Sequence, residues 1–347
     1  MQTSTRRGLL AGALALGGGI SLPTLRAQED LFRGKTIRIL VGAQAGQSYD
    51  LAARILANHI KKYLPGAPGV VVENMPGAGS LTMTNYIYNS GSRDGMLIGL
   101  PLSSILLEPA LNLTSRAGGQ VRFDLRKINW IGTPVKDPPV LLVSAKTGIS
   151  SFDELRRREI TVGASGAGSD NALAATLSNA LLGSKLRIVA GYGGVSDIML
   201  ALERGEVEGF ATGYSALPVA RPQWLANGTV KLLAQFGLER IRQQPAVPTA
   251  VELATSADAK EMLRIYGRKF NAAYPFMLPP DVPADRVELV RAAFMNTLTD
   301  PDFQEQFAKS GMVLDPVMGP EIEQLIKSTD EAPPQLVAQL RDILVQK

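Results

Sequence analysis

Residues 36–50 read TIRILVGAQAGQSYD, and this stretch contains the pattern from which the fold can be inferred. Its first six residues form a short apolar run rich in β-branched side chains, which is typical of a strand buried in a sheet. A loop of glycine and small polar residues follows, and a helix with an apolar stripe is predicted over residues 50–63. The stretch therefore predicts the strand–loop–helix unit of an α/β protein.

This unit recurs along the chain. Further strands are predicted at residues 69–73, 96–100, 140–143, 160–163, 186–190, 207–211, 230–234 and 273–278. Further helices are predicted at residues 150–158, 171–182, 197–204, 283–299, 301–309 and 320–345. The alternation of strands and helices indicates α/β layers with largely parallel sheets.

No Gly/Ser/Pro-rich linker interrupts the predicted elements. We therefore expect two lobes joined by strands that cross between them, near residues 134–143 and again near residues 245–248. This predicts a first lobe of residues 28–135 plus 246–347 and a second lobe of residues 136–245. Such a joint makes a hinge, and small molecules bind in clefts at domain interfaces, beyond the carboxyl ends of parallel strands.

Three strand-to-helix loops, at residues 42–50, 74–80 and 163–171, are rich in glycine and small polar residues. Glycine lets the backbone approach a ligand closely, and the N–H groups at a helix start attract an anion. The alternative is that each loop is a tight turn with a helix cap. Three such loops in one chain favour a binding cleft. The serines placed to cap these helices or to donate to a carboxylate are Ser48, Ser80 and Ser169.

Nucleotide-binding motifs are incomplete in these loops. None of the three loops has the Gly-Lys-Ser/Thr sequence that a P-loop places at the helix start. The sequences GAGSLT at residues 77–82 and GAGSDN at residues 166–171 each lack a glycine of the dinucleotide-binding pattern. Neither is followed by a strand that ends in an acidic residue. Nucleotide-dependent enzymes are therefore not favoured.

The composition is that of a globular protein with room for two cores: 347 residues, of which 45% are hydrophobic and 20% charged. Arg6, Arg7 and Arg26 lie within the first 27 residues, which contain no acidic residue. Without these three, the 36 basic side chains become 33, against 32 acidic ones. A near-neutral body offers no basic surface for nucleic acid, so we expect no nucleic-acid partner.

Residues 1–27 have the pattern of an export signal, with a charged start, an apolar run at residues 8–20 and Ala27 at the exit. The apolar run is too short to span a hydrocarbon core of roughly 30 Å, which favours a cleaved peptide over an anchor. The sequence TRRGLL at residues 5–10 resembles a twin-arginine signal, and the general secretory route remains open beside it. We therefore expect a periplasmic protein.

The chain has no cysteine and one histidine, His59. The absence of cysteine excludes disulfides and a thiol nucleophile. His59 falls on the predicted helix at residues 50–63, where a packed or half-exposed histidine is expected. A metal site built on several imidazoles is excluded, and a serine hydrolase would need His59 as its base, although no nucleophilic serine loop lies beside it. We expect no catalytic activity, no cofactor and no metal.

Several residues near the loops have two possible roles. Asp50 begins the helix after the first loop, where it either caps the helix or binds an ammonium or hydroxyl group of a ligand. Tyr49, Tyr192 and Tyr214 lie in or near loops that follow strands, where they either close over a ligand or pack at the rim. The sequence leaves both pairs of roles open.

Three loop sequences follow one family pattern. VENMPGAGS at residues 72–80 is similar to Val-x-Asn-x-Pro-Gly-Ala-Gly-Gly, and this is the most specific match. GAQAGQSYD at residues 42–50 keeps one glycine and the aspartate of a first-loop motif, and GASGAGSDN at residues 163–171 matches Gly-x-x-Gly-x-Gly-Ser/Thr. Over nearly the whole chain after the leader, the sequence resembles the periplasmic solute receptors of tripartite tricarboxylate transporters, the Bug-type receptors.

The resemblance implies a two-lobed α/β periplasmic binding protein of type II-like fold, with crossing hinge strands and an interlobe ligand cleft. It implies a receptor, expected to be a monomer, that delivers a small carboxylate to the membrane subunits of a tripartite tricarboxylate-type transporter. Carried over onto this sequence, the candidate ligand-binding residues are Ala43, Gln44, Ser48, Tyr49, Asp50, Gly79, Ser80, Ser103, Ser104, Ser165, Gly168, Ser169, Asp170 and Tyr192.

The three loops contain no arginine, so a bidentate clamp on the ligand is not indicated. We expect a carboxylate that bridges two helix starts and is bound by neutral donors, helix dipoles and waters. Two alternatives remain at this point. In the first, the closed receptor would present its ligand to a sensor kinase rather than to a transporter. In the second, the chain would be an exported hydrolase.

Overall fold

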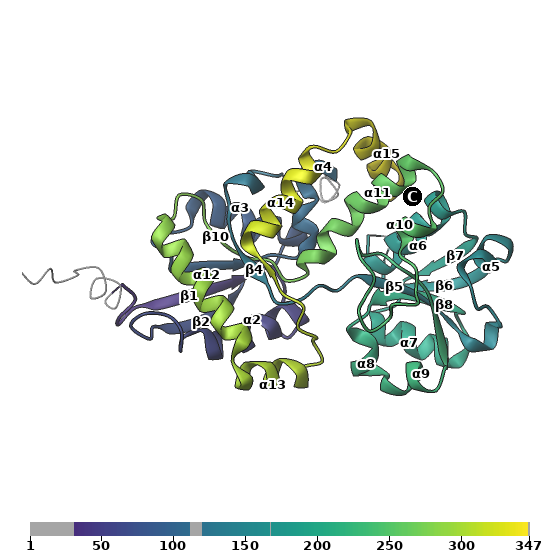
Figure 1. The fold of residues 1–347 in the computed structure, drawn as a ribbon, viewed down its shortest axis with the longest axis horizontal. Coiled ribbons are helices and arrows are strands. Elements are labelled where there is room, and N and C mark those ends of the chain that lie inside the picture. Colours follow the sequence, from purple (N-terminus) through teal and green to yellow (C-terminus); the bar gives the residue numbers. More distant parts are fainter. Residues whose placement is uncertain (1–30, 112–119, 167, 346–347) are drawn as a thin grey trace, which may run out of the picture.

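The structure, a computed structural model, describes residues 31–111, 120–166 and 168–345. The predicted export segment at residues 1–27 lies outside the described residues. Figure 1 shows two α/β lobes side by side, each built on its own sheet. The predicted two-lobed α/β fold is confirmed. In the part of the chain that the structure describes, no helix is both long and apolar enough to cross a membrane.

The first sheet has the strand order β11-β4-β10-β3-β1-β2. Its strands are β1 (Thr36–Val41), β2 (Gly69–Asn74), β3 (Leu97–Leu100), β4 (Asn129–Thr133), β10 (Phe276–Leu278) and β11 (Val317–Met318). Strand β1 is parallel to β2 and β3, whereas β10 runs antiparallel to β3 and β4. The sheet is therefore mixed rather than largely parallel, because β10 carries the chain back from the second lobe.

Helices cover both faces of the first sheet, and β1 shows why. Ile37, Ile39 and Val41 alternate along the strand and pack on one face, whereas Leu40 packs on the other. On the first face lie α2 (Ser48–Ile60), α12 (Ala284–Thr299) and α13 (Pro301–Lys309). On the second face lie α3 (Leu81–Ser90) and α14 (Gly319–Asp330).

The second sheet has the order β7-β6-β8-β5-β9. Its strands are β5 (Pro139–Ser144), β6 (Ile160–Ala164), β7 (Leu186–Ala190), β8 (Gly209–Gly213) and β9 (Val230–Gln235). One face is covered by helices α7 (Val195–Arg204), α8 (Ala216–Ala220) and α9 (Pro222–Ala226). The other face carries α5 (Phe152–Arg157), α6 (Asp170–Leu182), α10 (Ala250–Leu253), α11 (Ala257–Arg268) and α15 (Pro334–Val345).

Two crossing segments, residues 134–138 and 269–275, join the lobes. The first leads from β4 of the first sheet into β5 of the second, and the second leads from α11 back into β10. The segments lie side by side, since the N–H of Ala273 donates to the carbonyl of Val135 (3.2 Å) and the N–H of Asp137 donates to that of Phe270 (3.1 Å). The predicted first crossing is confirmed.

The predicted second crossing near residues 245–248 is wrong. The backbone of Gln235, at the end of β9, forms a parallel bridge with Thr249, and its side-chain amide donates to the carbonyl of Val247 at 2.6 Å. This segment is therefore bound to the edge of the second sheet. The chain returns to the first sheet only after α11 (Ala257–Arg268), a helix that was not predicted from the sequence.

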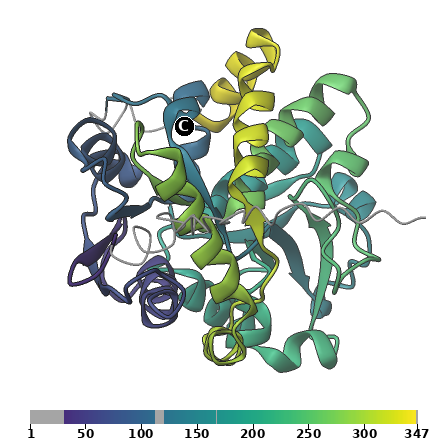
Figure 2. The ribbon, with the colours of Figure 1, turned by 60° about the vertical axis from the view of Figure 1, so that its left-hand side comes forward.

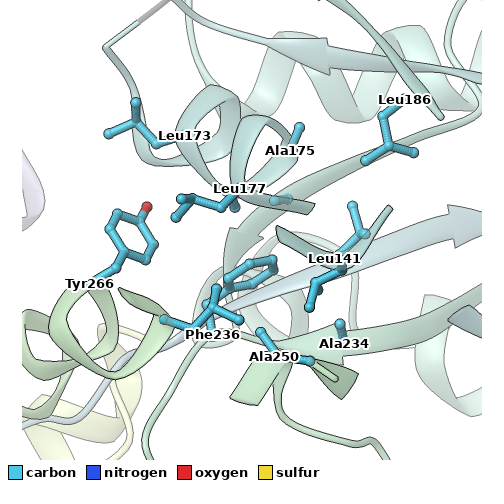
Figure 3. Packing of buried hydrophobic residues seen from close by; sticks show 14 of the residues in the cluster. Leu141, Leu173, Ala175, Leu177, Leu186, Ala234, Phe236, Ala250 and Tyr266 are labelled. Atoms are coloured by element: carbon cyan, nitrogen blue, oxygen red, sulfur yellow. The ribbon is translucent and has the colours of Figure 1, made fainter. Parts of the chain in front are cut away.

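Helices α11 and α15 pack into the core of the second sheet, although the predicted lobe boundaries place residues 246–347 with the first. Figure 3 shows Tyr266 of α11 beside Phe236, with Leu177 of α6 and Leu141 of β5 in the same core. Figure 2 shows the yellow C-terminal helices standing between the blue part and the teal part of the chain. The C-terminal region therefore connects both lobes.

Other elements also differ from the predictions, among them the short helices α8, α9 and α10, which were not predicted. Strands β4 and β11 were not predicted. The predicted helix at residues 320–345 is two helices, α14 and α15, because Pro333 and Pro334 interrupt it. A proline removes a backbone donor and excludes the helical conformation of the residue before it, so a helix does not continue through such a pair.

The strand directions place the three glycine loops at the interlobe edges of the two sheets. Strand β4 ends where the first crossing segment begins. Strand β3 runs in the same direction as β4, because both are antiparallel to β10, and β1 is parallel to β3. Strand β5 starts where that crossing ends. Strand β8 is antiparallel to β5 and parallel to β6, so both β8 and β6 end near the crossing.

Replacing Leu340 by alanine tests the packing of α15 on the second lobe. Leu340 is fully buried in that core, so Leu340→Ala should lower the free energy of unfolding by about 2–5 kcal/mol. Leu200→Ala on α7 is the matched control, because its side chain is 40% exposed, and it should cost less than about 1 kcal/mol. Urea unfolding measures both. Equal small losses would contradict this packing.

Candidate functional site

Ser80 connects the first two glycine loops to the loop after β3. Its hydroxyl donates to the carbonyl of Gly42 (3.0 Å) and accepts from the N–H of Leu102 (2.9 Å). A Cβ at Gly42 would lie 2.3 Å from the Ser80 hydroxyl, so this contact requires glycine. Ser80 is fully buried. Its hydroxyl therefore holds three loops together and is not directed at a ligand.

The backbone that presents Ser80 is strained. Ala78, Gly79 and Ser80 all have positive φ angles, of 45°, 60° and 76°. The left-handed region costs a residue other than glycine roughly 1–2 kcal/mol. Such strain persists only where surrounding contacts hold it, and it concentrates at functional sites. Here the two hydrogen bonds of the Ser80 hydroxyl supply those contacts.

Asp50 braces the first loop from within. One carboxylate oxygen accepts from the N–H of Gly46 (2.8 Å) and from Arg54 Nε (2.9 Å), and the other accepts from the Asn74 amide (3.0 Å). Burial raises the pKa of Asp50, but hydrogen bonds from Arg54, Gly46 and Asn74 outweigh it, and the net pKa is lowered. The Asn74 amide also donates to the carbonyl of Ala43 (3.1 Å). Asp50 therefore braces the first loop, a role that was not predicted, and does not cap α2.

Tyr49 links helix α2 to the loop after β3. Its hydroxyl accepts from the N–H of Ser103 (3.1 Å) and donates to the Ser103 hydroxyl (3.4 Å). Its ring lies 4.6 Å from that of Tyr274, which lies in the second crossing segment. Burial raises the pKa of Tyr274 to about 12, so its hydroxyl stays protonated at neutral pH. Ser104 is half-buried beside this group.

The start of α2 is the exposed part of this group. Gln44 and Ser48 are exposed, and Gln47, at the N-cap position, makes no side-chain cap hydrogen bond. The first N–H groups of a helix have no partner inside it, and they carry the positive end of the helix dipole. The Asp50 carboxylate turns back to Gly46 instead of capping them. The start of α2 is therefore suited to bind an anion.

The third loop is organised around Asn171. The Asn171 side-chain oxygen accepts from the N–H of Ser165 (3.2 Å) and of Ala172 (3.0 Å), and from the Ser169 hydroxyl. The Ser169 hydroxyl also accepts from the N–H of Ala172, so it caps α6. Gly168 is exposed. The side chains of Ser165 and Ser169 are thus used within the loop, and the predicted capping role of Ser169 is confirmed.

Asp170, the first residue of α6, forms an ion pair that the sequence analysis did not predict. Its carboxylate oxygen Oδ1 accepts from Lys269 Nζ at 2.5 Å. Lys269 is only 2% exposed and lies at the start of the second crossing segment, with its ammonium 4.7 Å from the ring centres of both Tyr266 and Phe270. In the sequence, Lys269 lies between Tyr266 and Phe270, and these aromatic neighbours were the available signal for its burial.

The two remaining tyrosines pack at the ends of strands. Tyr192 is half-buried, and its ring lies over Gly163 of β6, in the satellite core of α7. Tyr214 is half-buried after β8, and its hydroxyl accepts from the Gln244 amide at 3.3 Å. Both side chains therefore have packing contacts at strand ends, and Tyr214 also lines a pocket.

A pocket of about 140 Å³ lies beside the crossing segments. Its lining includes Asp137, Tyr214, Ser215, Arg242 and Asn271, and the three glycine loops do not contribute to it. The Asp137 carboxylate accepts from the N–H (3.0 Å) and hydroxyl (2.9 Å) of Ser215. Burial raises the pKa of Asp137 despite these bonds. Among the described residues, one polar group therefore lies around this pocket and another around the start of α2, both near the crossing segments.

Comparisons with known proteins agree with this arrangement. The family described as the tripartite tricarboxylate transporter family receptor (TctC) matches residues 52–339. The UPF0065 protein in the gbd 5' region of Cupriavidus necator is 26% identical over 324 residues, which cover 88% of this chain and 87% of that protein.

Solved structures show the same fold. A ligand-free TctC solute-binding protein from Polaromonas has a TM-score of 0.68 at 20% identity and covers 88% of this chain and 98% of that one. MatC from Rhodopseudomonas palustris, solved with bound malate, has a TM-score of 0.57 at 20% identity and covers 89% of this chain and 98% of its own.

Asp50→Asn tests the brace of the first loop through its pH dependence. The variant should lose about 1–3 kcal/mol of unfolding free energy at pH 7, because charge-assisted hydrogen bonds are lost. The pKa of Asp50 is lower folded than unfolded, where it is about 3.9, so its contribution is present above that pH and is lost as the pH falls through the lowered value. The two proteins should therefore converge in acid. Asp302→Asn, whose side chain is 76% exposed, is the control and should change little. A constant difference at every pH would contradict this role.

Proposed function

Because the chain belongs to the tripartite tricarboxylate transporter receptor family, we propose that it binds a small carboxylate between its lobes and delivers it to the membrane subunits of a tripartite tricarboxylate-type transporter. The observation that carries the proposal is the uncapped, exposed start of α2 at the interlobe edge of the first sheet. Helix starts of this kind bind carboxylates through N–H groups and the helix dipole.

The proposed site uses residues from both lobes in two ways. Gln44, Ser48 and the N–H groups at the start of α2 would contact the ligand directly. Ser80, Asp50 and Ser169 would position the loops, since their side chains are occupied by the hydrogen bonds described above. The remaining candidates would shape the walls: Ala43, Tyr49, Gly79, Ser103, Ser104, Ser165, Gly168, Asp170 and Tyr192. Malate bound to MatC supports a carboxylate as the ligand class.

Ligand binding would favour closure of the lobes about the crossing segments. Closure is favoured by contacts that only the closed state makes to both lobes. The two backbone hydrogen bonds between the crossing segments would keep the joint narrow, so that rotation rather than separation is the available motion. The closed form is the one that we expect the transporter to recognise.

A receptor without catalytic activity fits the position of His59. The residue is buried on the side of α2 that faces α13, with its Nε2 atom 2.8 Å from Gln306 Oε1 and its ring 5.7 Å from that of Phe303. The Asp300 carboxylate lies 3.8 Å from its Nδ1 atom, but among the described residues no serine hydroxyl is bonded to the ring, so these contacts lack the nucleophile of a Ser-His-Asp triad. Export to the periplasm through residues 1–27 and a monomeric state complete the proposal.

Thermal shift with a panel of small carboxylates, malate included, tests the proposal. An acid present at about 100 times its Kd should add about 2.7 kcal/mol to the free energy of unfolding. Tyr49→Phe should weaken the binding of a hit about tenfold, because it frees the N–H of Ser103 and loosens the site. Tyr63→Phe, which loses a bond to Asp300 away from the site, should leave binding unchanged. Stabilisation by sugars and by no acid would refute the carboxylate class.

A further inference from the structure

The Asp170–Lys269 pair has one buried end and one exposed end. The Lys269 side chain is 2% exposed, whereas the Asp170 side chain is 49% exposed. Oxygen Oδ1 of Asp170 accepts from Lys269 Nζ (2.5 Å) and from the Tyr266 hydroxyl (3.5 Å). Among the described residues, the other oxygen, Oδ2, has no hydrogen-bond partner. The ion pair therefore keeps its cation enclosed and presents a carboxylate oxygen to its surroundings.

Those surroundings are the interlobe region. The turn that contains Lys269 (Lys269–Ala272) packs on the turn that contains Ser103 (Ser103–Leu106), and Ser103 is bound to Tyr49 at the start of α2. A chain of contacts therefore runs from the Asp170 carboxylate through Lys269 and the turn of Ser103 to Tyr49 at the start of α2.

The two helix starts at the interlobe edges are therefore not equivalent. The start of α2 carries no acceptor from its N-cap side chain, and the carboxylate in its first turn, Asp50, is 3% exposed with both oxygens already hydrogen-bonded. The start of α6 is capped by Ser169 and carries the Asp170 carboxylate in its first turn. A second anion at α6 would face a like charge, whereas a cation or a hydrogen-bond donor would be attracted. The expected carboxylate that bridges both helix starts does not fit this asymmetry.

We propose that the ligand is an amino acid-type zwitterion, whose carboxylate binds the start of α2 and whose ammonium binds the Asp170 carboxylate. The inference rests on the proposed function and names the ligand class of that site. An ammonium is preferred to a hydroxyl group, since its positive charge attracts the carboxylate in addition to the hydrogen bond, which is charge-assisted with either donor. Lys269 is the positioning residue, because it fixes the carboxylate and leaves Oδ2 for the ligand.

Isothermal titration of the purified protein with matched acids tests this ligand class. The pairs propionate and alanine, succinate and aspartate, and glutarate and glutamate differ only in the ammonium group. We expect the amino member of the best pair to bind at least about tenfold more tightly than its partner, as one charge-assisted hydrogen bond requires. Equal affinities, or tighter binding of the unsubstituted acid, would overturn the inference.

Asp170→Asn identifies the responsible side chain. It should weaken the amino member about tenfold or more and change the unsubstituted acid by less than about threefold. Asp153→Asn is the matched control, because Asp153 also lies in the first turn of a helix of the second lobe and pairs with a cation, Arg156. It should change neither acid. A uniform loss for both acids in Asp170→Asn would show a structural role and contradict selection by Asp170.

A second variant guards against misfolding. Asp170→Asn leaves the Lys269 ammonium buried without its anion, so the double variant Asp170→Asn/Lys269→Met removes both charges. It should show the same loss of preference for the amino member, and retained preference would refute the role of Asp170. The outcomes also separate the two proposals. Binding of unsubstituted acids alone refutes the zwitterion and leaves the carboxylate receptor, whereas no binding of any acid refutes both.

Discussion

Two backbone hydrogen bonds join the crossing segments, from Ala273 to Val135 and from Asp137 to Phe270, and they fix the joint on which the placement of both sheets depends. Because β4 leads into the crossing and β5 leads out of it, each parallel strand of either sheet ends near the joint. Loops that follow parallel strands are where α/β proteins bind small molecules. The joint therefore brings the loops of two separate sheets to one region.

The charges of the site follow from this placement. The first lobe supplies neutral donors and a helix start, held by the buried Ser80 hydroxyl and the Asp50 carboxylate. The second lobe supplies a carboxylate, Asp170, whose partner Lys269 comes from the crossing segment itself. Burying the Lys269 end of this pair costs desolvation energy that offsets the attraction, so the pair adds little net stability. Its value here is that it orients one exposed oxygen at a site where the two lobes meet, so that the joint and the ligand preference share a residue.

The sequence predicted what local patterns encode and missed what distant contacts decide. The apolar run at residues 36–41 and the glycine loops correctly indicated the strands, the helix starts and the two-lobed fold. The burial of Ser80 was not predictable, because it depends on a left-handed turn and on Gly42 and Leu102, which lie far along the chain. The same reason applies to Asp170, whose partner is 99 residues away. The short strands β4 and β11 have little periodicity of their own, and the return crossing was misplaced at the prolines of residues 245–248, which belong to a sheet edge.

The position of a bound acid in a crystal structure tests the central claim most directly. The acid should lie between the lobes, with a carboxylate within hydrogen-bond distance of the N–H groups at the start of α2 and its opposite end near Asp170. An acid bound instead in the pocket beside Tyr214 and Arg242, or on one lobe alone, would contradict the view that the carboxyl ends of the two sheets form a single binding site.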